Sequence, residues 1–74
     1  MVTASLVVET TPGKIRSAGQ EISAIPGVTV HNFEGYRIIL TVRVGADSEF
    51  HDVMATIENV DGVVETSVIY RQTD

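Results

Sequence analysis

Alternation of side chains in the segment from Tyr36 to Val44 constrains this chain more than any other feature. From Ile38 on, the even positions are all aliphatic: Ile38, Leu40, Val42 and Val44. The odd positions are mostly polar: Arg37, Ile39, Thr41 and Arg43. Successive side chains of a β-strand point to opposite faces, so the pattern predicts a strand with one face in a core and one face left open. The rest of the chain must supply the layer that covers the apolar face.

Three further segments are predicted to be strands. Residues 5–9 are short and β-branched, with Leu6 and Val8 facing one way. In residues 28–33, Val28 and Val30 face one way, and the other face has Thr29, His31 and Phe33. In residues 63–72 one face has Val64, Thr66, Val68 and Tyr70, and the other has Glu65, Ser67, Ile69 and Arg71. Glu34-Gly35 is predicted to form a tight hairpin between the second and third strands.

Two segments have helical periodicity. Thr11-Pro12 predicts the start of a helix whose apolar positions are Ile15, Ala18, Ile22 and Ile25, and Pro26-Gly27 ends it. Asp47 or Ser48 is predicted to cap a second helix, with an apolar stripe of Phe50, Val53, Met54, Ile57 and Val60. Gly19 lies inside the first helix, and we expect that it is tolerated there rather than required for close packing.

The element order is therefore βαββαβ, an α+β chain. Right-handed crossovers predict a four-stranded antiparallel sheet in spatial order 4-1-3-2 with both helices on one face, which is the ferredoxin-like split βαβ sandwich. At 74 residues the chain has room for one core, so we expect a single domain over residues 1–74. The predicted core contains Leu6, Val8, Ile22, Ile38, Leu40, Val42, Phe50, Ile57 and Val68.

Catalytic and metal-binding motifs are absent from the sequence. The chain has no cysteine, and it lacks HExxH, Walker and GxGxxG patterns. His31 and His51 are expected on opposite sides of the sheet, and the carboxylates near Asp47 suit a helix N-terminus. We therefore expect a protein that is not an enzyme and that holds no metal and no cofactor.

The charge and the first residues bear on partners and location. A net charge of −5 disfavours nucleic acid and is compatible with a cationic peptide. The first residues lack a basic region and a long apolar stretch, so we expect a cytoplasmic protein that does not insert into membranes. Zero cysteines fit a reducing compartment.

The strand order places several polar and apolar residues that the core does not require on the face of the sheet without helices. Val7, Ile39 and Ile69 are expected to form a central apolar strip, with carboxylates at one end that could accept arginines. Ser5, Ser67 and Thr41 are expected toward the other end. The candidate binding residues are Ser5, Val7, Glu9, Phe33, Arg37, Ile39, Thr41, Glu65, Ser67 and Ile69. An ordinary solvated sheet, or a sheet that dimerises through this face, remains an alternative interpretation of the same pattern.

Several segments together resemble the NapD family of assembly chaperones for periplasmic nitrate reductase. They are Ser5-Leu6-Val7-Val8, Ala24-Ile25-Pro26-Gly27-Val28, Asp47-Ser48-Glu49, Thr56-Ile57-Glu58, and Asp61-Gly62-Val63 with Ser67-Val68-Ile69-Tyr70. They cover nearly the whole chain in the family's order. The sequence departs from the family pattern in its short Glu34-Gly35 hairpin, in Arg71 where a histidine is common, and in lacking a longer polar tail.

The resemblance implies a ferredoxin-like fold and a cytoplasmic chaperone, acting as a monomer or weak dimer. Its partner would be the twin-arginine signal peptide of the nitrate reductase catalytic subunit, and its binding would delay export until the molybdenum cofactor is inserted. One alternative is a small-ligand-sensing regulatory βαββαβ module that acts as a dimer. A second is a small metal chaperone, which the absence of cysteine disfavours.

Overall fold

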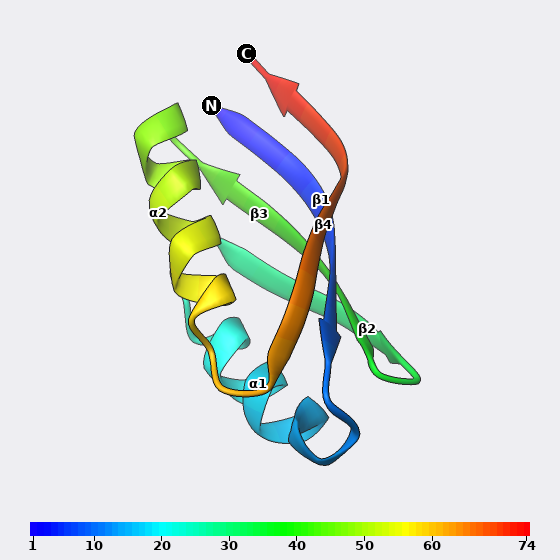
Figure 1. The fold of residues 1–74 in the computed structure, drawn as a ribbon. Coiled ribbons are helices and arrows are strands. Elements are labelled where there is room, and N and C mark those ends of the chain that lie inside the picture. Colours follow the sequence, from blue (N-terminus) through cyan, green and yellow to red (C-terminus); the bar gives the residue numbers. More distant parts are fainter.

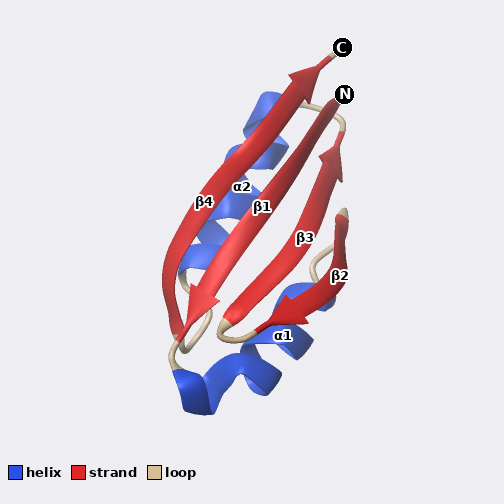
Figure 2. Ribbon diagram, turned by 90° about the vertical axis from the view of Figure 1, so that its right-hand side faces the viewer, coloured by secondary structure: helices blue, strands red, loops and turns tan.

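The sheet contains four antiparallel strands, and its order is β2-β3-β1-β4. The computed structural model describes residues 1–74. Their elements are β1 (Val2–Thr10), the 3-10 turn η1 (Pro12–Lys14), α1 (Ile15–Ser23), β2 (Val28–Glu34), β3 (Arg37–Val44), α2 (Asp47–Glu58) and β4 (Val63–Thr73). Both helices cover one face of the sheet, and the other face is open (Figures 1 and 2). The ferredoxin-like βαββαβ fold and the strand order predicted from the sequence are confirmed.

The two central strands, β1 and β3, keep the predicted alternation. Leu6 pairs with Leu40 and Val8 with Ile38, and all four side chains are fully buried. Ala18 and Ile22 of α1 and the apolar side of α2 complete the core. Of the predicted core residues only Val68 is misplaced. It lies opposite Leu6 but is 46% exposed, because β4 is an edge strand that the helices do not fully cover.

Both edge strands contain irregularities that the alternation did not predict. In β2, Val30 pairs with Leu40 and Asn32 with Ile39, so His31 is an extra residue. In β4, Val68 pairs with Leu6 and Tyr70 with Ser5, so Ile69 is an extra residue. A one-residue bulge exchanges the two faces of the strand beyond it.

Three predicted positions are wrong for that reason. Phe33 pairs with Ile38 and therefore faces the helices, whereas it was expected on the open face. Tyr70 pairs with Ser5 on the open face, and Arg71 pairs with Ala4 on the helix face. An irregularity earlier in β4, between the pairs Thr10–Val63 and Glu9–Glu65, also leaves Val64 exposed, although it was expected on the helix face.

Arg71 fastens the end of β4 to the start of α2. Its guanidinium pairs with the Asp47 carboxylate and lies over the Phe50 ring, 4.6 Å from the centroid. Asp47 was expected as a candidate helix cap, but α2 begins at Asp47 itself after Ala46, and no side chain caps it. The Asp47 carboxylate therefore serves the contact between α2 and β4.

Gly19 allows a close contact between α1 and β2, which contradicts the expectation that it is merely tolerated. A Cβ placed on Gly19 would lie 2.7 Å from Cε1 of Phe33, so the missing side chain leaves room for that ring. Once the bulge at His31 turns Phe33 toward the helices, the ring needs this space. The glycine and the bulge are thus two parts of one packing arrangement.

Lys14 of η1 is joined to the loop between α2 and β4. Its ammonium lies 2.8 Å from the Asp61 carboxylate, and this hydrogen bond and charge raise the pKa of Lys14 above its ordinary value. Gly62 follows with φ +94°, and a Cβ there would lie 2.3 Å from Cβ of Lys14. Only glycine fits this turn without displacing the chain.

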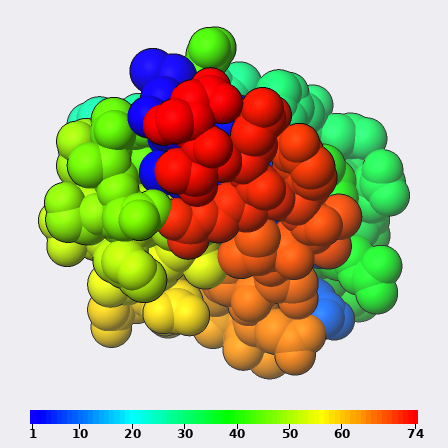
Figure 3. Space-filling model, turned by 90° about the horizontal axis from the view of Figure 1, so that it is seen from above, coloured from blue at the N-terminus to red at the C-terminus, as the bar shows by residue number.

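The two termini lie together at the opposite end of the molecule. Seen from above, the end of β4 lies against the first residues of β1 (Figure 3), where Val2 pairs with Thr73. The α-amino nitrogen of Met1 lies 3.3 Å from the Asp74 carbonyl oxygen. Neither helix has the length and apolar character needed to cross a membrane.

Candidate functional site

The candidate site is the open face of the sheet, which is turned toward the viewer in Figure 2. All of the predicted site residues except Phe33 lie on this face. Their cross-strand pairs show this directly, since residues opposite each other on neighbouring strands share a face. Ser5 pairs with Thr41, and Val7 pairs with Ile39 on one side and Ser67 on the other.

A shallow depression of about 230 Å³ lies in the middle of this face. Its lining consists of Val7, Glu9, Arg37, Glu65, Ser67 and Ile69, all of which were predicted. The residues come from β1, β3 and β4, which are neighbours in the sheet although β1 and β4 stand at opposite ends of the chain. Apolar side chains, two carboxylates and the Arg37 guanidinium therefore share one concave surface.

A row of charged residues crosses the sheet at one end of the depression. Glu34 pairs with Arg37, Arg37 with Glu9, and Glu9 with Glu65, so the row contains three carboxylates and one guanidinium. The structure contains two ion pairs, Lys14–Asp61 and Arg71–Asp47, and neither involves this row. Arg37 thus lies opposite Glu9 without an ion pair closer than 4.0 Å.

The Glu9–Glu65 pair is the most informative part of that row. Like charges directly opposite each other on neighbouring strands are destabilising. No lysine or arginine nitrogen lies within 4.0 Å of either carboxylate, so both can accept hydrogen bonds from a bound cation. A guanidinium has the geometry to bridge carboxylate oxygens with two or more N–H donors.

The apolar part of the face lies beside the charged row. Val7 and Ile39 are half-buried, Ile69 is 66% exposed, and Tyr70, which the prediction omitted, is 56% exposed. These side chains give a partner an apolar surface to cover. Ser67 lies opposite Val7 rather than at the serine and threonine end where it was expected, because Glu65 pairs with Glu9 and the antiparallel register then brings Ser67 to Val7.

The serine and threonine end of the face is partly occupied by internal contacts. Ser5 lies between Thr41 and Tyr70, and Nε2 of His31 lies 2.7 Å from Oγ1 of Thr41. This hydrogen bond engages the Thr41 hydroxyl. The acidic end and the apolar centre are therefore the parts of the face with the most unused binding capacity.

Sequence reasoning also missed Asn32 and Glu34, which lie on the open face opposite Ile39 and Arg37. One signal could have placed them. The predicted hairpin loop Glu34-Gly35 is wrong by one residue, since the loop is Gly35-Tyr36. Counting back across this two-residue loop from Arg37 pairs it with Glu34 and turns Phe33 to the helix face. The bulge at His31 has no comparable signal in the sequence.

No arrangement typical of a metal site occurs in the structure. Nowhere do three histidine, cysteine, aspartate or glutamate side chains come together in a way that could hold an ion. A larger cavity, about 640 Å³, lies on the other face of the sheet beside α1 and contains none of the open-face residues. What the open face itself can do chemically is accept hydrogen bonds from cations and cover apolar groups.

Comparisons with known proteins agree with this fold. The family model described as NapD protein matches residues 1–74. The solution structure of the E. coli Tat proofreading chaperone NapD is 24% identical in sequence, with a TM-score of 0.86 over 97% of this chain and 78% of that one. A crystal structure of a Thermus thermophilus protein is also 24% identical, with a TM-score of 0.70 over 100% of this chain and 99% of that one. No match was found among curated proteins.

Proposed function

This chain belongs to the NapD family, and from that premise we propose that it is a Tat proofreading chaperone. Its ligand is the twin-arginine signal peptide of the catalytic subunit of a periplasmic nitrate reductase. It acts in the cytoplasm, has no catalytic turnover, and delays export until the molybdenum cofactor is inserted. The solved structure with a TM-score of 0.86 is that of a Tat proofreading chaperone, which supports the proposal at the level of fold.

The observation that carries the proposal is the unpaired carboxylate pair Glu9–Glu65 in the depression beside Val7 and Ile69. A twin-arginine signal peptide has two guanidinium groups followed by an apolar segment. Its receptor needs acceptors for the first and an apolar surface for the second, and the open face has both. Binding would also relieve the repulsion between the two glutamates, so part of the affinity comes from strain in the free protein.

Arginine rather than lysine is favoured by this geometry. A guanidinium presents planar N–H donors that can contact two carboxylates at once, whereas an ammonium is a compact charge that loses more hydration. Replacing both arginines of the peptide by lysine should therefore weaken binding by about tenfold, the lower end of the range for a charged hydrogen bond. Burial of Ile39, Ile69 and Tyr70 under the apolar segment of the peptide would add to the affinity, but with little dependence on the peptide's sequence.

Calorimetric titration with the synthetic signal peptide tests this proposal. The variants Glu9→Lys and Glu65→Lys should each weaken binding by about tenfold or more, because they replace an acceptor by a like charge. Ile69→Asp should weaken binding through the apolar segment and leave the fold intact, since Ile69 is 66% exposed. Ile39→Asp provides the same test on β3.

Glu21→Lys is the matched control, because it makes the same charge change at an exposed position on α1, on the other side of the sheet. It should bind like the wild type. Normal binding by all open-face variants, together with loss of binding from changes on α1 or on the outer edge of β2, would place the site elsewhere. Absence of binding by the wild-type protein would reject the function itself.

A further inference from the structure

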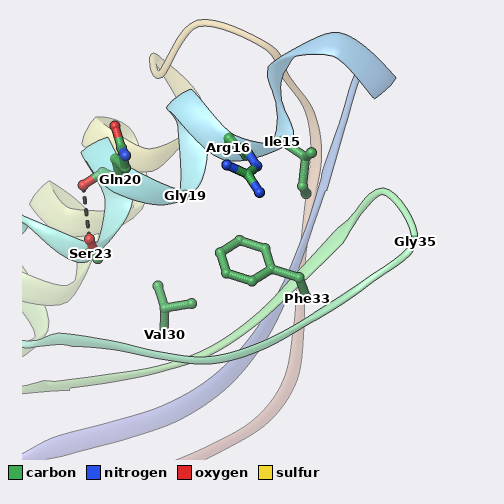
Figure 4. Close-up of a pocket in the computed structure, with 8 residues that line it drawn as sticks. All are labelled: Ile15, Arg16, Gly19, Gln20, Ser23, Val30, Phe33 and Gly35. Carbon is green, nitrogen blue, oxygen red and sulfur yellow. Dashed lines mark hydrogen bonds between the residues drawn. The ribbon is translucent and has the colours of Figure 1, made fainter.

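A groove of about 640 Å³ separates α1 from β2 on the helix side of the sheet (Figure 4). Ile15, Gly19 and Arg16 of α1 line it from above, and Val30 and Phe33 of β2 line it from below. The Phe33 ring lies against Gly19 and is nevertheless 50% exposed, since the groove is open at the side. This surface belongs to the opposite face from Glu9 and Glu65.

The groove runs along the outer edge of β2. β2 is the first strand of the sheet and pairs only with β3, so its outward backbone groups have no partner strand. The amide N–H of Phe33 donates to the side-chain oxygen of its neighbour Asn32 at 2.9 Å and not to a strand, so an added strand would replace this hydrogen bond. β2 lacks the lysine or proline that commonly protects a free edge, and residues 32–34, beyond the bulge at His31, pair regularly with β3.

Arg16 is the only charged residue that lines the groove. It is exposed and takes part in neither of the two ion pairs of the protein. Arg37 and Arg43 are also in no ion pair, but Arg16 is the one cation beside this groove. It favours a ligand that brings a carboxylate.

We propose that this groove binds an extended, acidic segment of a partner protein, which adds to the free edge of β2 as a fifth strand. Alternate side chains of the added strand point toward α1 and enter the groove. An apolar side chain of the segment contacts Phe33 and Val30, and a carboxylate two residues away pairs with Arg16. The site is separate from the open face, so the protein can hold this segment and a cationic peptide at the same time.

Binding to the edge of β2 is what would distinguish a protein segment from a free small acid in this groove. A free acid would need the groove alone, whereas the added strand also needs the outward backbone groups of β2. A useful probe is the blocked peptide acetyl-Thr-Val-Thr-Leu-Thr-Glu-Thr-amide, in which Val, Leu and Glu share one face of an extended strand. Its neutral form has Gln in place of Glu, and two further forms are N-methylated at one or the other alternate set of residues.

The experiment is titration of the ¹⁵N-labelled full chain with each peptide, followed by amide chemical shifts. We expect the largest shifts at Arg16, Gly19, Val30 and Phe33, with none at Glu65. The neutral peptide should bind about twofold to fivefold more weakly, as expected for a solvent-exposed ion pair. One of the two N-methylated forms should lose binding and the other should keep it, because only one set of amides faces β2.

Arg16→Gln should reduce the affinity for the acidic peptide to that of the neutral one, and should not change the affinity for the neutral peptide. Arg43→Gln is the matched control, since Arg43 is an exposed arginine of β3 that is in no ion pair and lies outside the groove. Arg16→Gln should not alter binding of the twin-arginine peptide, because Arg16 lies on the other side of the sheet from the open face. The outcome here is therefore independent of the proposed function.

Equal binding by both N-methylated forms would overturn the proposal, because strand addition requires one set of amides. Shifts at the groove produced by free 4-methylpentanoate with the affinity of the peptide would also overturn it, in favour of a small-molecule site. An unchanged affinity of Arg16→Gln for the acidic peptide would remove the charge recognition on which the choice of partner rests.

Discussion

The central strands β1 and β3 of this sheet are regular, whereas the edge strands β2 and β4 contain bulges. β1 and β3 alternate strictly, with every second side chain buried, whereas β2 has an extra residue at His31 and β4 has one at Ile69. A central strand has partners on both sides and a helix layer above, so a one-residue shift would expose its whole apolar set. An edge strand has only one partner, so a bulge there disrupts fewer backbone hydrogen bonds and costs less than it would in a central strand.

The largest expected effect of this difference is on stability. Leu40→Ala in β3 should lower the free energy of unfolding by about 2 to 5 kcal/mol, because Leu40 is fully buried and its removal leaves a cavity. Val68→Ala in β4 should cost less than about 1 kcal/mol, since Val68 is half exposed. Urea unfolding of both variants measures the contrast. Equal losses would show that the edge strand contributes to the core as a central strand does.

A second expectation concerns the contact between Gly19 and Phe33. In the Phe33→Ala background, Gly19→Ala should raise stability by about 1 kcal/mol through helix propensity. In the wild type the gain should be smaller or reversed, because the new Cβ would lie 2.7 Å from the Phe33 ring and the ring must move. A double-mutant cycle measures this coupling. Additive effects would contradict the orientation of Phe33 that the β2 bulge produces.

The bulge in β4 leads to a third expectation. Arg71→Gln should cost about 1 kcal/mol, since it removes an exposed ion pair with Asp47 and a cation–π contact with Phe50. Arg43→Gln on the central strand β3 should change stability by less than about 0.5 kcal/mol, because Arg43 is in no ion pair. Thermal unfolding compares the two. If Arg43→Gln costs as much as Arg71→Gln, the bulge does not direct Arg71 toward α2.

The smallest expected effect separates Glu65 on the edge strand from Glu9 on the central strand. Glu65→Gln should raise the free energy of unfolding by about 0.2 to 1 kcal/mol, because it removes a like-charge pair. Glu9→Gln should be nearly neutral, since it also removes the attraction to Arg37 on the other side. Low-salt denaturation measures both. A loss of stability in Glu65→Gln would mean that this carboxylate serves the fold.

The sequence was sufficient to predict the features of the fold that depend on the buried core. The alternation from Arg37 to Val44, the two helix stripes and the turn residues identified the fold, the strand order and nearly all of the core. The open-face position of Glu9 and Arg37 followed from the same alternation, because both lie on central strands. The site residues on the regular central strands could thus be predicted from the alternation of side chains and from the right-handedness of the crossover connections.

The residues that were misplaced lie beyond bulges in edge strands. The positions of Tyr70 and Arg71 depend on a single extra residue upstream in β4, and no local pattern shows it. The position of Phe33 could have been inferred from the two-residue hairpin loop. The pairing of Asp47 with Arg71 joins two elements distant in sequence, so a helix cap was the better local explanation of Asp47. For Phe33, Tyr70 and Arg71 the error is one of strand register, and not of element type.

The central claim is that a twin-arginine signal peptide binds the open face through the acidic end of β1 and β4. The most direct test is an amide chemical-shift map of the ¹⁵N-labelled protein with that peptide, repeated with its twin-lysine form. We expect the largest shifts at Val7, Glu9, Ile39, Glu65 and Ser67, with smaller ones for the twin-lysine peptide. Shifts confined to Arg16, Gly19 and Phe33 across the sheet, or identical maps for the two peptides, would contradict it.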